Sequence, residues 1–100
     1  MTQYAYIHGF ASSPLSSKGL ALAEAFEAKG LPFHRPDLNQ PSFSELTFRG
    51  ALGAISKMCE EHPEETWRFI GSSMGGYLSA LFAERHPERI SRLLLLCPGF

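Results

Sequence analysis

The chain has 100 residues, 44% hydrophobic and 19% charged, a composition typical of one small globular domain and not of a disordered polypeptide. Nine basic against ten acidic residues give a net charge of -1, which offers no electrostatic case for nucleic acid or an anionic membrane. The longest aliphatic run, residues 93–96, is far shorter than the ~20 residues of a membrane helix, and the N-terminus does not resemble a signal peptide. With two cysteines and no disulfide framework, we expect a cytoplasmic protein.

The first half of the chain alternates strand-like and helix-like segments. Residues 4–7 are an aromatic and β-branched run that predicts a first strand, which stops before Gly9. Residues 15–29 are rich in Ala, Leu and Glu and predict a helix, with Gly30 as its C-cap. Residues 32–35 predict a short second strand.

The second half continues the alternation. Ser42 and Glu45 have the spacing of a capping box, so we expect the second helix to begin there. Residues 67–70 predict the third strand and residues 75–86 the third helix. Residues 90–97 predict a fourth strand, nearly all apolar, as is typical of a strand covered on both faces. Apolar residues recur at helical spacing and predict one buried stripe on the second helix: Phe48, Ala51, Leu52, Ile55, Met58 and Cys59.

This alternation predicts an α/β fold, a mainly parallel sheet of four strands with three flanking helices. The fourth strand would be an open edge if the protein ended at Phe100, and an uncovered apolar edge favours self-association. We therefore expect residues 1–100 to be the N-terminal part of a single larger domain, cut after the fourth strand. The alternative is a small self-associating domain whose edge a partner chain covers.

One motif carries chemistry. Gly71-Ser72-Ser73-Met74-Gly75 fits G-x-S-x-G and lies between a predicted strand and a predicted helix, which is the context of a nucleophile elbow. Such a turn strains the backbone of its central residue, so its neighbours must be small, and it exposes the central hydroxyl at a helix N-terminus. Ser73 is therefore the candidate nucleophile, because Ser72 lies one residue too early to stand between the two glycines. The alternative is an ordinary turn rich in glycine and serine. The pattern matches neither a dinucleotide-binding loop nor a P-loop.

A second signal is His8-Gly9-Phe10, directly after the first strand. If the second and third strands lie on opposite sides of the first, the switch point of the sheet falls between this loop and Ser73. The backbone N–H of Phe10 could then pair with that of Met74 to bind an oxyanion, and Gly9 would permit the close approach. The alternative is an ordinary strand-ending glycine beside a core-facing histidine.

Together, three segments resemble the α/β-hydrolase superfamily and, within it, the small single-domain esterases of the YqiA-like family. They are Tyr6-Ile7-His8-Gly9-Phe10-Ala11-Ser12-Ser13, Pro36-Asp37-Leu38 and Gly71-Ser72-Ser73-Met74-Gly75-Gly76-Tyr77.

The resemblance implies the strand order second-first-third-fourth within a larger sheet. It implies Ser73 as the nucleophile, Phe10 and Met74 as oxyanion-hole donors, and hydrolysis of small-molecule carboxylic esters through an acyl-enzyme without a cofactor. The alternative function is a hydrolase-like module that binds a ligand or a partner without catalysis.

The chain departs from the family where the rest of the triad should be. Family members place an acid and then a histidine after the serine, but here no Asp follows Ser73 and the only later histidine is His86. At ~1.5 Å per residue His86 would lie ~20 Å along the helix. His8 is nearer, and we expect it to fix the loop rather than act as the base. Asp37 is expected to cap a turn or a helix rather than orient a catalytic histidine. We therefore expect the triad acid and histidine to lie outside these residues, and the chain alone to be inactive.

The other residues that could carry chemistry, the cysteines and several aromatic residues, have patterns typical of core packing. Cys59 and Cys97 lie in apolar patterns, with no cationic partner to lower a thiol pKa, and the histidines and cysteines show no metal-ligand spacing. Four aromatic residues could line an acyl pocket or pack in the core: Phe10, Phe43, Phe48 and Tyr77.

Overall fold

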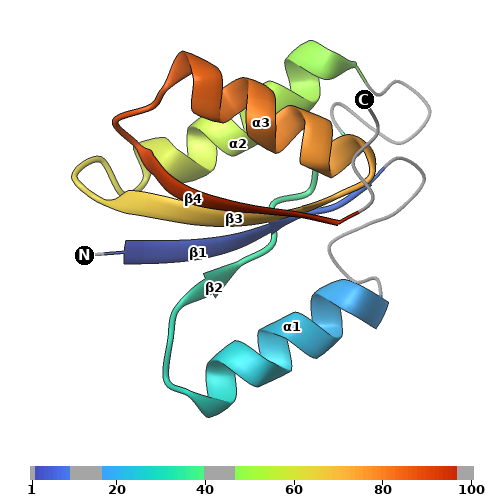
Figure 1. Ribbon diagram of the computed structural model, residues 1–100, viewed down its shortest axis with the longest axis vertical. Coiled ribbons are helices and arrows are strands. Elements are labelled where there is room, and N and C mark those ends of the chain that lie inside the picture. Colours follow the sequence, from blue (N-terminus) through green and yellow to red (C-terminus); the bar gives the residue numbers. More distant parts are fainter. Residues whose placement is uncertain (1, 10–16, 40–46, 97–100) are drawn as a thin grey trace.

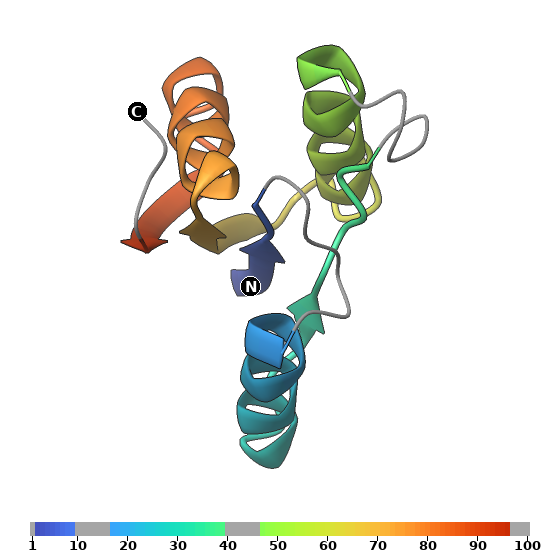
Figure 2. The same cartoon turned by 90° about the vertical axis from the view of Figure 1, so that its right-hand side faces the viewer.

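A computed structural model describes residues 2–9, 17–39 and 47–96. Its elements are β1 (Thr2–Ile7), α1 (Ser17–Ala28), β2 (Phe33–His34), α2 (Phe48–Glu60), β3 (Thr66–Ser72), α3 (Met74–Arg85) and β4 (Ile90–Leu96). The four strands form one parallel sheet in the order β2-β1-β3-β4, which confirms the predicted class and strand order. Helices α2 and α3 cover one face of the sheet and α1 lies on the other (Figures 1 and 2). No described helix is long and apolar enough to cross a membrane.

The register of the sheet brings two distant turns together. β1 pairs with β3 along its length, from Thr2 opposite Thr66 to Ile7 opposite Gly71. The chain therefore leaves β1 and β3 at the same edge of the sheet. Since β2 and β3 lie on opposite sides of β1, that edge is the switch point where open α/β sheets place their sites.

The core lies mainly between the sheet and helices α2 and α3. Trp67 and Phe69 on β3 are almost fully buried, as are Ile55 of α2 and Leu78 of α3. The opposite face is covered by aromatic contacts from α1, where the Phe26 ring lies 5.0 Å from that of Tyr4 and 4.5 Å from that of Phe33. Helices thus pack on both faces of the central strands.

The ends of two helices illustrate one correct prediction and one wrong one. Gly30 has φ +69° and ends α1 as predicted, with Leu31 N–H donating to Phe26 O at 3.0 Å. α2 begins at Phe48, later than the predicted start at residue 42, because the Thr47 hydroxyl caps it by accepting from Gly50 N–H at 2.9 Å. Ser42 and Glu45 lie outside the described residues.

The fourth strand is less buried than its sequence predicts. β4 is an edge strand, paired with β3 alone, and its residues 91–94 are exposed. Leu94 is 55% exposed and Leu93 36%. The expectation that both faces are covered is therefore wrong for the described residues, because α3 packs against β4 only in part and leaves Leu93 and Leu94 exposed. Cys97 lies outside the described residues.

A single arginine closes the turn between α2 and β3. The Arg89 guanidinium donates to the carbonyl oxygens of Cys59 at 2.9 Å, His62 at 2.8 Å and Glu65 at 3.1 Å. Hydrogen bonds from a charged donor are stronger than neutral ones, and their loss leaves backbone carbonyls without these partners.

We predict that Arg89→Met lowers the free energy of unfolding of the full-length protein by roughly 2 kcal/mol, the loss expected for charge-assisted hydrogen bonds in a half-buried place. Urea denaturation followed by circular dichroism measures the change. Arg92→Met, at an exposed position on β4, is the matched control and should stay within about 0.5 kcal/mol of wild type. Equal destabilisation by the two substitutions would contradict this role of Arg89.

Candidate active site

Ser73 lies in the sharp turn between β3 and α3, with φ +54° and ψ −123°. Among the described residues it is the only one other than glycine with a positive φ, a conformation that costs on the order of 1–3 kcal/mol. The turn is held by Ser73 N–H donating to Leu96 O at 3.0 Å and by Ser73 O accepting from Gly76 N–H at 2.9 Å. The Ser73 side chain is exposed, whereas that of Ser72 is nearly buried. The strand–turn–helix context and the strained backbone predicted for Ser73 are thus present.

Three glycines allow backbone segments to meet at this turn. A Cβ on Gly71 would lie 2.7 Å from the carbonyl oxygen of Gly75. A Cβ on Gly75 would overlap the carbonyl group of Ile7 at the end of β1. A Cβ on Gly9 would lie 3.0 Å from Cβ of Ser73, so Gly9, just after β1, lies directly against the serine. The predicted glycine positions therefore correspond to real close approaches.

His8 binds neighbouring backbone through both ring nitrogens. Its side chain is buried, with Nε2 accepting from Leu38 N–H at 2.9 Å. The ring hydrogen therefore sits on Nδ1, which donates to Gly9 O at 3.0 Å. No lone pair is left for a general base, so the geometry supports the expected structural role. Asp37 Oδ1 lies 3.8 Å from Nε2 and accepts from Asn39 N–H at 3.0 Å, which confirms that Asp37 caps a turn.

The other histidines lie away from Ser73, as predicted. His34 and His62 have ring centroids 5.0 Å apart and both pack on Trp67, near the beginning of β3. The pKa of His34 lies below its usual value because burial penalises the charged ring, with His62 adding to the effect. His86 ends α3, with its ring 4.5 Å from that of Phe82.

The two predicted oxyanion donors differ in what the structure describes. Met74 is the first residue of α3, so its N–H has no acceptor within the helix and lies at the positive end of the helix dipole. Phe10 lies outside the described residues, as does Phe43. Tyr77 is half-buried in the first turns of α3.

Sequence reasoning missed one polar contact at the turn. Lys18, in the first turn of α1, donates from Nζ to Ser72 Oγ at 3.3 Å across 54 positions of sequence. Its only signal in the sequence is a cation at a helix N-terminus, where the dipole disfavours it.

Cys59 is a core residue, as predicted. It is buried, and burial raises the pKa of its thiol to about 11, so it is protonated near neutral pH. The expectation that it lacks a cationic neighbour is wrong. The Arg89 guanidinium lies close enough to lower the thiol pKa, but burial has the larger effect.

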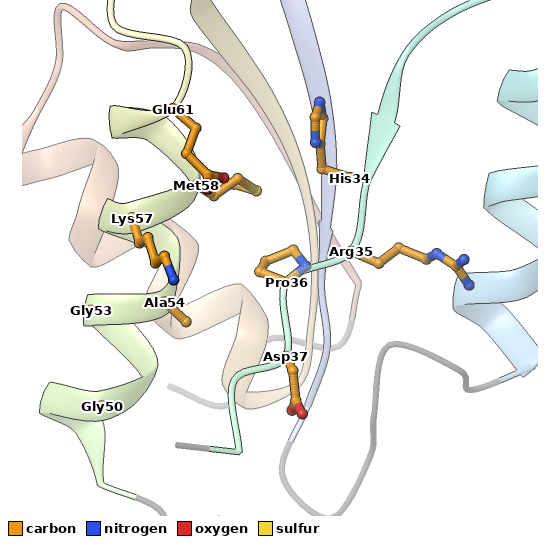
Figure 3. Close-up of a pocket in the computed structure, with 10 residues that line it drawn as sticks. All are labelled: His34, Arg35, Pro36, Asp37, Gly50, Gly53, Ala54, Lys57, Met58 and Glu61. Carbon is orange, nitrogen blue, oxygen red and sulfur yellow. The ribbon is translucent and has the colours of Figure 1, made fainter. Parts of the chain in front are cut away.

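A cavity of about 560 Å³ opens between α2 and the chain that leaves β2 (Figure 3). Its lining includes Arg35, Asp37, Lys57 and Glu61 but no residue of the Ser73 turn. In Figure 3 the Arg35 side chain points away from α2, which carries Lys57 and Glu61, so the charged groups do not converge on one ligand position. No group of three or more His, Cys, Asp or Glu residues among the described ones could hold a metal ion.

Comparison with known proteins gives consistent results. The model of an uncharacterised protein family, UPF0227, matches residues 3–99. Mouse α/β hydrolase domain-containing protein 10 has a similar structure, with TM-score 0.82 and 23% identity over 93% of this chain and 39% of its own. A Xanthomonas campestris protein assigned to the α/β superfamily of hydrolases gives TM-score 0.74 and 28% identity over 97% and 58%. A Xenopus laevis protein, monoacylglycerol lipase abhd6-A, is 42% identical over 36 residues, 36% of this chain and 11% of its own. The chain thus spans less than two thirds of each of these proteins.

The close approach at Gly75 gives a test of the turn. We predict that Gly75→Ala lowers the free energy of unfolding of the full-length protein by about 3 kcal/mol, because the new methyl group must displace the end of β1. Gly53→Ala is the matched control, since Gly53 is exposed within α2 and has open space around it. This substitution should stabilise the protein by roughly 0.5–1 kcal/mol through helix propensity. Chemical denaturation measures the free energy of unfolding of both variants. Equal stability of the two would contradict the packing described.

Proposed function

Because the chain belongs to the family UPF0227 and has an α/β-hydrolase fold, we propose that the protein is a serine hydrolase that cleaves small carboxylic esters, with Ser73 as its nucleophile. The observation that carries the proposal is the backbone of Ser73. A serine held at φ +54° between a strand and a helix is costly to maintain. The nucleophile elbow uses that conformation to expose the hydroxyl.

In the proposed reaction, Ser73 Oγ attacks the acyl carbon of the ester and loses its proton to a histidine. The carbonyl oxygen becomes an oxyanion, which accepts hydrogen bonds from the N–H groups of Met74 and Phe10. The histidine returns the proton to the departing alcohol, and an acyl-enzyme remains. Water then attacks the acyl group by the same route and regenerates the serine. Protein groups supply every step, so the proposal needs no cofactor.

We further propose that the histidine and its acid come from beyond residue 100, and that residues 1–100 are the N-terminal part of one hydrolase domain. His8 is occupied by two hydrogen bonds, and the other histidines lie away from Ser73. The coverage of the neighbours, 39% and 58% of their chains, supports the same division. Without the histidine, only about 10³–10⁴-fold acceleration over water would remain from binding and the oxyanion hole.

Two observations support a small-molecule ester as the substrate. The Xenopus relative is named a monoacylglycerol lipase, which is a carboxylic ester hydrolase. The net charge of -1 offers no electrostatic case for nucleic acid as the substrate. Thioesters and amides react through the same nucleophile, so parallel assays with the three kinds of acyl compound distinguish them.

We predict that a fluorophosphonate probe labels the full-length protein at Ser73, because such probes react with activated serine hydroxyls. Ser73→Ala should abolish labelling and lower turnover of a short-chain ester by roughly 10³-fold or more. Ser56→Ala, on α2 and away from the turn, is the matched control and should label as wild type does.

Gel fluorescence and peptide mass spectrometry read out the labelled residue. Labelling that survives Ser73→Ala would contradict the assignment. A folded full-length protein that neither labels nor hydrolyses any of the three acyl compounds would support the non-catalytic binding module instead.

A further inference from the structure

The contact between Lys18 and Ser72 joins α1 to the residue directly before the proposed nucleophile. Lys18 Nζ lies 3.3 Å from Ser72 Oγ, and Ser72 is only 9% exposed. Ser72 is the last residue of β3, so this hydroxyl is one peptide unit from the strained backbone of Ser73.

The contact comes from the face of the sheet opposite α3. Side chains alternate along a strand, so Ser72 shares a face with Arg68. The Arg68 guanidinium lies 5.8 Å from the centre of the Tyr4 ring, which itself packs on Phe26 of α1. Ser73, in contrast, is held by hydrogen bonds to Leu96 of β4 and from the first turn of α3. Lys18 therefore supplies a side-chain anchor of the turn from the α1 side.

The position of Lys18 in the first turn of α1 is not explained by the stability of the helix itself. The first turn of α1 contains Lys18 and no acidic residue, and its last turn has no basic residue. A cation in the first turn opposes the helix dipole, which favours acidic side chains at the N-terminus and basic ones at the C-terminus. Among the described residues Lys18 also has no carboxylate partner; its partner is the Ser72 hydroxyl. Features that conflict with local preferences are expected at functional sites.

We propose that Lys18 is a positioning residue for Ser73. Its ammonium group donates to Ser72 Oγ, which fixes the end of β3 from the α1 face and holds the Ser73 hydroxyl in its attacking position. The inference rests on the proposed hydrolase function. Lys18 acts through Ser72, so removing the donor or the acceptor should have the same consequence, and removing both should add little.

A double-mutant cycle in the full-length protein tests this. With kcat expressed per fluorophosphonate-titrated site, Lys18→Met and Ser72→Ala should each lower kcat for a short-chain ester by roughly tenfold, the size of one charge-assisted hydrogen bond. KM should stay within about twofold, because the contact does not touch the substrate. The double variant should be no slower than the slower single variant, and Lys18→Arg, which keeps a cationic donor, should restore most of kcat.

Lys29→Met is the matched control, an exposed lysine just beyond the other end of α1, and should leave kcat unchanged. Wild-type kcat in Lys18→Met, or losses that multiply in the double variant, would overturn the positioning role. A lower fraction of titrated sites with unchanged kcat per site would also overturn it, since that result indicates folding alone. Failure of the hydrolase proposal looks different: the wild-type protein would show neither labelling nor hydrolysis, or Ser73→Ala would leave both intact, and in either case Lys18 would have no nucleophile to position.

Discussion

The close approach of β1 to the first turn of α3 is the constraint on which the rest of the candidate site depends. Gly75 lies so near the carbonyl group of Ile7 that no side chain fits between them. Gly9, just after β1, lies against Ser73 next to this contact. The contact at Gly75 requires the chain to turn within one residue of leaving β3, which is why Ser73 has a positive φ. The strain at Ser73 and the position of Gly9 beside it thus belong to one close contact.

Much of this could be predicted from the sequence because the constraints are local. Glycines at 71 and 75 around a serine, between an apolar strand and a helix, indicate a tight turn whatever surrounds it. The parallel sheet followed from alternating segments, and its strand order followed from a family resemblance, which the structure confirms.

The features that sequence reasoning missed depend on contacts between distant segments. Thr47 rather than Ser42 caps α2, and a capping pattern alone does not say which of two hydroxyl residues is used. The bonds from Arg89 to the α2–β3 turn and from Lys18 to Ser72 cross 24 to 54 positions, and no short-range spacing predicts them. The apolar sequence of β4 correctly indicated a strand, but burial depends on what packs against it, and the described elements leave Leu94 exposed.

In the proposed enzyme, residues 1–100 supply the nucleophile and the oxyanion donors, and the protein beyond residue 100 supplies the histidine and the acid. Ser73, Gly9 beside it and the N-terminus of α3 are described, and His8 is committed to backbone hydrogen bonds. The most direct measurement is a crystal structure of the full-length protein after reaction with a phosphonate inhibitor. The account predicts phosphorus bonded to Ser73 Oγ, a phosphonyl oxygen within hydrogen-bond distance of Met74 N–H, and a histidine from beyond residue 100 beside the serine. Phosphorus on another residue, or His8 as the base beside Ser73, would contradict it.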